Sequence, residues 1–132
     1  MMAFLAESAL CVGELLKRSG GMEALVLDPS AAESLEELEL ALHLARKSFG
    51  AKTALAKKLK YEFLLWLTGK TDIKSAMVKS APKDPGNLLI VLLGGSKAHV
   101  LKELEAREKK KALKKNADAL RLEEISLSRI KN

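Results

Sequence analysis

Five lysines flank one glycine in the middle of this 132-residue chain. They are Lys57, Lys58, Lys60, Lys70 and Lys74. The first three precede an apolar run, and the last two follow Gly69. Ammonium groups beside the start of a helix favour phosphate binding, because the first backbone N–H groups of a helix also attract anions. We therefore expect an anion-binding site around this glycine.

The elements that position these lysines are predicted from residues 55–77, LAKKLKYEFLLWLTGKTDIKSAM. From Tyr61 to Leu67 the apolar residues cover almost every direction around a helix, which indicates a central, buried helix. Gly69 stands where a helix end favours positive φ, and Thr71 could cap a second helix. The sequence predicts a helix, a glycine corner and another helix.

Three side chains of this run have two readings each. Phe63 and Trp66 could stack on a base, but their helical spacing favours a place in the core. Glu62 could receive a base from a partner, although pairing with Lys58 or with a neighbouring helix end is favoured. Tyr61 lies beside the lysines and is the better candidate for the surface.

A second basic run, REKKKALKK, covers residues 107–115. Such a run is either a solvated surface or a contact for phosphates, and the sequence leaves both open. We expect a basic helix or linker over residues 107–116. A C-terminal helix should follow, with Leu120, Leu127 and Ile130 as candidate partner-binding residues.

The sequence contains no arrangement of residues typical of catalysis. It has no Ser/His/Asp or Cys/His pattern in a supporting context, no paired carboxylates in an apolar setting and no phosphate loop. Cys11 is the only cysteine, and His43 and His99 are too few to complete a metal site with it. We expect no enzyme activity, metal, cofactor or small-molecule substrate.

Composition indicates one soluble domain over residues 1–132, because 48% of the residues are hydrophobic and 30% charged. No apolar run approaches the roughly 20 residues that span a bilayer. The opening MMAFLAESAL lacks the features of a signal peptide, so we expect a cytoplasmic protein that does not bind membranes. A net charge of +6 permits binding to polyphosphate.

The remaining elements predict an α+β fold, a helix-rich bundle packed on a small sheet. Ala24–Leu27 and Leu88–Leu93 read as strands, the second buried on both faces. Ser34 and Glu37 form a capping box for a helix over residues 35–49. Residues 1–20 read as a helix, although the first ten could form a strand.

The order of these pieces resembles a known family. EFLLWLTGKTDIKSAMVKSAPKDPGNLLIVLL and, upstream, LVLDPSAAESLEELELALHLARKSF resemble the small kinase-binding (TPRKB-like) subunit of the archaeal KEOPS complex. The resemblance covers roughly residues 13–93. The chain departs from the usual Gly-x-Arg-Gln-Ile of that family, with Lys70, Thr71, Asp72 and Ile73 after Gly69.

The resemblance implies a noncatalytic regulatory subunit with an α+β fold. Such a subunit binds the small atypical kinase of KEOPS (PRPK) and recruits tRNA through its single-stranded CCA end for threonylcarbamoyladenosine synthesis. On this chain, cations would neutralise the phosphates of the tRNA end while a surface near Tyr61 and Ile73 receives its bases. The expected RNA-binding residues are Lys57, Lys58, Lys60, Tyr61, Gly69, Lys70, Thr71, Ile73 and Lys74.

Two other functions stay open. One is a structural adaptor that binds only protein, with the positive charge serving solubility. The other is a stand-alone RNA-binding protein whose basic run grips phosphates without selecting RNA ends.

Overall fold

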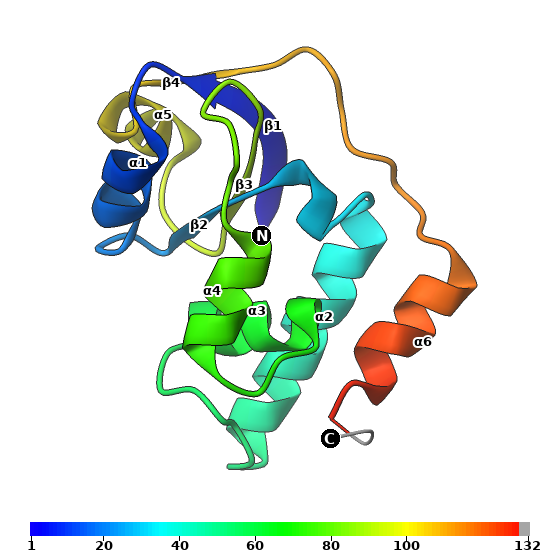
Figure 1. Ribbon diagram of the computed structural model, residues 1–132. Coiled ribbons are helices and arrows are strands. Elements are labelled where there is room, and N and C mark those ends of the chain that lie inside the picture. Colours follow the sequence, from blue (N-terminus) through cyan, green and yellow to red (C-terminus); the bar gives the residue numbers. More distant parts are fainter. Residues whose placement is uncertain (130–132) are drawn as a thin grey trace. The chain divides into compact units, whose positions relative to one another are not determined.

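A computed structural model describes residues 1–129, which have an α+β fold (Figure 1). Contacts within the chain divide it into two compact units. The sheet unit comprises Met1–Ser30 and Ala81–Leu113, and the helical unit comprises Ala31–Ser80 and the chain from Lys114 onward. The expected single domain over residues 1–132 stays a prediction, and we describe each unit by itself.

The sheet unit is built on four antiparallel strands in the order β2-β3-β1-β4. The strands are β1 (Met2–Ser8), β2 (Ala24–Leu27), β3 (Leu88–Leu92) and β4 (Ala106–Glu108). In the register, Ile90 of β3 lies opposite Phe4 of β1 and Val26 of β2. The strands predicted at Ala24–Leu27 and Leu88–Leu93 are confirmed.

Two short helices, α1 (Val12–Ser19) and α5 (Lys97–Glu103), accompany the sheet. Alternate strand residues pack with Leu15 of α1 and Val100 of α5 in one apolar cluster. Leu89 and Val91 point to the other face of β3 and are also fully buried. Burying such side chains stabilises the fold by about 1.5–3 kcal/mol each, and β3 is buried on both faces as predicted.

The first residues form a strand rather than a helix. Met2 to Ala6 of β1 pair with β3, so their backbone groups bond to a neighbouring strand. The helical stretch begins only at Val12, after Cys11. The alternative of a strand in the first ten residues is confirmed, because Phe4 and Ala6 alternate into the core.

The helical unit contains α2 (Leu35–Gly50), α3 (Leu59–Thr68), α4 (Ile73–Ser80) and α6 (Ala119–Leu127), and a single turn, η1 (Pro29–Ala31), precedes α2. Helix α3 packs against α2, α4 and α6, and α6 also packs against α2 (Figure 1). The capping box of α2 is confirmed. Ser34 Oγ accepts the backbone N–H of Glu37 at 3.2 Å, and the Glu37 carboxylate accepts that of Ser34 at 2.8 Å.

Helix α3 is the buried centre of its unit, as its apolar sequence predicts. Phe63, Leu64, Leu65 and Leu67 are each buried. The helix begins at Leu59, four residues inside the run 55–77 from which the helix pair is predicted. The physical reason is that Glu62 Oε1 accepts the backbone N–H groups of Leu55 and Ala56, at 3.0 and 3.1 Å, which holds that segment outside the helix.

Residues 107–116 contain no helix. Arg107 and Glu108 belong to β4, a short edge strand that the charged sequence of this run did not predict. Farther on, the carbonyl groups of Lys114 and Lys115 accept the backbone N–H groups of Leu35 and Glu36, at 2.7 and 3.0 Å. Within the described residues no helix is long and apolar enough to cross a membrane.

Candidate functional site

The corner between α3 and α4 turns on Gly69, which has a φ of 73° and a ψ of 16°. The Gly69 N–H donates to Leu65 O at 2.9 Å, closing α3. This left-handed conformation suits glycine because a Cβ would be strained there. The predicted positive φ is confirmed.

Asp72, rather than Thr71, caps α4. Asp72 Oδ2 accepts the Ser75 backbone N–H at 2.9 Å, and Thr71 is exposed. Both residue types can cap a helix, and α4 begins one residue later than a Thr71 cap requires. The hydrogen bond from the Ser75 backbone lowers the pKa of Asp72. A carboxylate therefore stands where the sequence had suggested a site for a phosphate.

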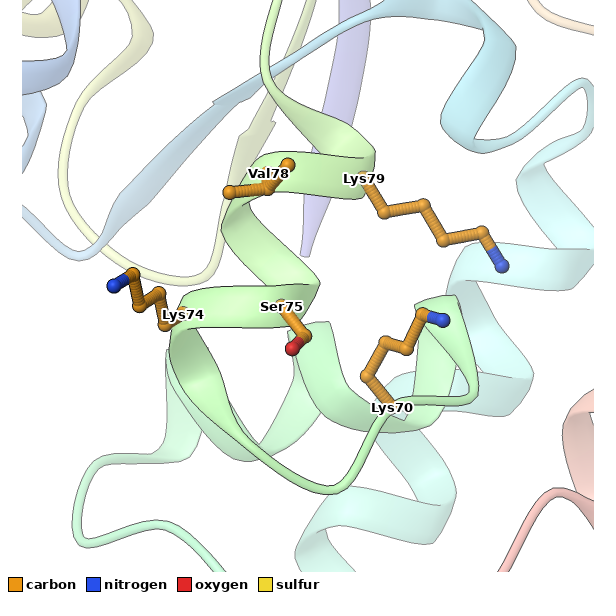
Figure 2. A pocket seen from close by; sticks show the side chains of 5 residues that line it. All are labelled: Lys70, Lys74, Ser75, Val78 and Lys79. Atoms are coloured by element: carbon orange, nitrogen blue, oxygen red, sulfur yellow. The ribbon is translucent and has the colours of Figure 1, made fainter.

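A surface depression of about 380 Å³ lies on α4 and the corner (Figure 2). Its lining residues are Lys70, Lys74, Ser75, Val78 and Lys79. Figure 2 shows Lys70 and Lys79 extending on one side of α4 and Lys74 on the other, with Ser75 between them. Lys70 and Lys74 take part in no ion pair within the described residues, so both ammonium groups are available to an anion.

The sequence analysis missed Lys79, although its spacing of four residues from Ser75 places the two on one face of α4. Lys79 Nζ donates to Thr68 O at 2.8 Å. Partial burial lowers the pKa of Lys79, and the nearby charges of Lys70 and Arg121 lower it further. The Lys79 ammonium thus binds a carbonyl group at the end of α3 and also contributes positive charge to the depression.

Arg121 of α6 also binds the C-terminal end of α3. Arg121 Nη2 donates to Leu67 O at 3.0 Å, and its Nε donates to Glu37 Oε1 at 2.7 Å. Cations at these carbonyl groups are stabilising because the C-terminus of a helix is the negative end of its dipole. Two cations from different helices thus anchor the corner.

The expected RNA-binding residues fall into two separate groups, because α3 lies between them. Lys57, Lys58, Lys60 and Tyr61 lie at its start, and Gly69 lies at its end. A helix of 10 residues separates its two ends by about 15 Å. Of the nine, the depression contains only Lys70 and Lys74.

The other expected RNA-binding side chains differ in exposure. Lys57 and Lys58 are exposed, whereas Lys60 is only 2% exposed and its Nζ lies 5.1 Å from the centre of the Tyr61 ring. Tyr61 and Ile73 are half-buried. Lys60 therefore does not present its cation to solvent as Lys57 and Lys58 do, because the whole residue is buried.

Glu62 is a fully buried acid whose partner lies just past the end of a neighbouring helix. Its Oε2 lies 2.8 Å from Nη2 of Arg129, which follows α6 in the chain. Of the two favoured pairings, the one with Lys58 is wrong, since no Lys58 side-chain ion pair occurs among the described residues. The other, with a neighbouring helix end, is confirmed, because Arg129 directly follows the C-cap of α6. The partner is 67 positions away along the chain, and helical spacing gives no signal for it.

Phe63 is fully buried, as its spacing predicts, whereas Trp66 is half-buried. Trp66 Nε1 donates to Ser48 Oγ of α2 at 3.0 Å. The guanidinium carbon of Arg129 lies 4.1 Å from the centre of a Trp66 ring. The indole face is therefore occupied by an arginine and not open to a base.

The expected partner-binding residues lie on or beside α6. Leu120 is 63% exposed, Leu127 is half-buried, and Ile130 lies outside the described residues. The buried apolar anchor of α6 is Ile125. Leu120 is the member of the set that offers an exposed apolar side chain to a partner.

The lysines of the second basic run lie on non-helical chain. Lys110, Lys111, Lys114 and Lys115 are exposed, and Lys109 is half-buried. The Lys109 backbone N–H donates to Leu5 O at 2.8 Å. These side chains form a solvated surface that could still contact phosphates.

The residues that could have carried other chemistry are on the surface. Cys11, His43 and His99 are exposed. Throughout residues 1–129, no group of three His, Cys, Asp or Glu side chains is placed to hold a metal ion. No protein-family model and no curated protein matches this chain.

Proposed function

We propose that this chain is a noncatalytic, cytoplasmic subunit of a KEOPS-type tRNA-modification complex. In this role it binds and regulates the small atypical kinase and recruits tRNA through its 3′ CCA end for threonylcarbamoyladenosine synthesis. The observation that carries the RNA half of the proposal is the depression on α4 with Lys70 and Lys74 at its rim. The kinase half depends on the resemblance of residues 13–93 to that family.

The chemistry of the depression suits an unstacked RNA end. A single-stranded terminus presents phosphates and the faces of its last bases together. Lys70 and Lys74 form no ion pair within residues 1–129 and offer cations for the phosphates. Val78 is 73% exposed and offers an apolar surface for the bases.

Asp72 sets a limit on the anion affinity of this surface. Its carboxylate accepts the Ser75 N–H at the start of α4, so that group is not free to bind a phosphate. The cations at the rim therefore supply most of the attraction, which makes the proposed binding dependent on salt.

A protein-only adaptor is the second candidate, favoured by exposed apolar side chains. Val78 of α4 and Leu120 of α6 are 73% and 63% exposed, so each offers an apolar side chain to a protein partner. In this reading α4 and α6 contact protein, and the lysines keep the chain soluble. The third reading assigns RNA binding to the exposed lysines of the second basic run.

One binding experiment separates the three. We would measure the affinity of the full chain for tRNA with its CCA end and for the same tRNA trimmed of it, across a salt series. The proposal predicts weaker binding after trimming. A steep salt dependence that is indifferent to trimming supports the basic-run reading, and no binding to either tRNA supports the adaptor reading.

The kinase half is tested by co-purification of the chain with the small atypical kinase. We expect a stable complex, and Leu120→Glu should weaken it because that exposed side chain gains a charge on α6. Lys110→Glu, also exposed, is the control for a general effect of charge. A complex insensitive to both changes would remove α6 from the proposed kinase surface.

A further inference from the structure

Arg129 lies in a slot made by side chains of α2 and α3. Glu62 Oε2 lies 2.8 Å from its Nη2, the Trp66 ring lies 4.1 Å from its guanidinium carbon, and Ser48 Oγ accepts from its Nη1 at 3.4 Å. The Arg129 side chain is 18% exposed and that of Glu62 is fully buried. One guanidinium thus meets a carboxylate, an aromatic face and a hydroxyl group.

These groups are the ones that recognise arginine. A guanidinium pairs with a carboxylate and stacks on an aromatic face, and tryptophan is the best aromatic partner. The carboxylate is fixed in advance, because the backbone N–H groups of Leu55 and Ala56 hold the other oxygen of Glu62. Trp66 is likewise fixed by its hydrogen bond to Ser48. A prearranged site of this kind loses little freedom on binding its ligand.

Arg129 fills this slot imperfectly. Its Nη2 is close to Glu62 Oε2 but poorly aligned. Glu62 Oε2 and the Nε and Nη2 of Arg129 are buried without a hydrogen bond within the described residues. Arg129 follows Ser128, which caps α6, so its side chain can leave without breaking a helical turn. A buried carboxylate oxygen that lacks a directed hydrogen bond is unfavourable, and a better placed guanidinium would relieve it.

We propose that the slot formed by Ser48, Glu62 and Trp66 is a binding site for an arginine on the surface of a protein partner. Arg129 is its intramolecular occupant in the free chain. The partner's arginine exchanges with Arg129. Because only molecules with an empty slot can bind it, the apparent dissociation constant equals the intrinsic one divided by the fraction of molecules whose slot is empty. The slot shares no residue with the depression on α4 and does not depend on RNA binding.

The test uses the full chain and a small probe, N-acetylarginine amide. Trp66 is the only tryptophan, so its fluorescence reports the slot alone. We expect a saturable fluorescence change in Arg129→Ala, with a dissociation constant roughly ten- to a hundredfold lower than in the unaltered chain, where Arg129 competes. At a tenfold excess over that constant, the probe should raise the Tm of Arg129→Ala by roughly 5 °C.

Three controls complete the experiment. N-acetyllysine amide should give no saturable change, because an ammonium lacks the planar fork that the slot fits. Arg46→Ala removes an exposed arginine of α2 and should respond as the unaltered chain does. If Arg129→Ala does not fold, Arg129→Gln, which also removes the guanidinium from the slot, is used instead of Arg129→Ala.

Equal responses of the Arg129 variant and the unaltered chain, or equal responses to the two probes, would overturn the site. No response of the unaltered chain at a hundredfold the dissociation constant of Arg129→Ala would overturn the exchange.

Discussion

Removing the Arg129 side chain should markedly destabilise the helical unit. Arg129→Ala leaves Glu62, which is fully buried, without its cation. Breaking a buried ion pair in this way costs about 3–5 kcal/mol, and a lost cation–π contact adds about 0.5–2 kcal/mol. The N–H groups of Leu55 and Ala56 still bind one oxygen of Glu62, and the partial exposure of Arg129 lets water replace it. We therefore expect a loss of about 3 kcal/mol.

Urea unfolding measures this loss through circular dichroism and Trp66 fluorescence. With an m value of about 1.5 kcal/mol per M, the midpoint should fall by about 2 M. Arg46→Ala, which removes an exposed arginine from α2, is the matched control and should leave the midpoint unchanged. If Arg129→Ala shifts the midpoint no more than Arg46→Ala does, Glu62 needs no cation, and our interpretation of the slot is wrong.

Three further predictions concern single residues of the helical unit. Gly69→Ala should lower the unfolding free energy by about 1–2 kcal/mol, measured in urea, because φ is positive there. Burial opposes ionisation of Glu37, but hydrogen bonds from Ser34 and Arg121 outweigh it and hold its pKa below the ordinary value. Its stabilisation is therefore fully present above about pH 4.3 and is lost as the pH falls through the lowered pKa, so Glu37→Gln should flatten stability against pH in that acidic range. Asp72→Asn should strengthen tRNA binding in a filter assay, since it removes a negative charge beside the lysines, and weaker binding would contradict the proposed surface.

Features specified by neighbouring residues could be predicted from the sequence. Ser34 and Glu37 lie three positions apart and satisfy each other's backbone groups, so the start of α2 needs no distant contact. Gly69 ends α3 for a similarly local reason. The unbroken apolar run of β3 is short and bounded by turn formers, which favours a strand buried on both faces.

Features that depend on distant residues could not be predicted. Glu62 and Arg129 are far apart in sequence, and only folding shows that they pair. The burial of Lys60 could not be predicted from the sequence either, because a lysine at the start of a helix is ordinarily exposed. Asp72 and Thr71 both favour caps, and a shift of one residue in the start of α4 decides between them.

The same limit applies to the candidate site. The sequence placed Lys70 and Lys74 beside the corner, and both line the depression. Lys79 was missed because its role depends on the end of α3, where Thr68 O accepts a hydrogen bond from Lys79 Nζ. Lys57 and Lys58 were grouped with the corner because sequence proximity does not show that α3 separates its two ends.

Charge reversal at the depression tests the proposed RNA contact most directly. The measurement is the affinity of Lys70→Glu/Lys74→Glu for tRNA bearing its CCA end, at one fixed salt concentration. The matched control, Lys110→Glu/Lys111→Glu, makes the same change in net charge on exposed lysines of the second basic run. We expect the first pair to weaken binding by roughly tenfold or more and the control by less than about threefold. An equal loss in both, or a greater loss in the control, would contradict RNA binding at the depression.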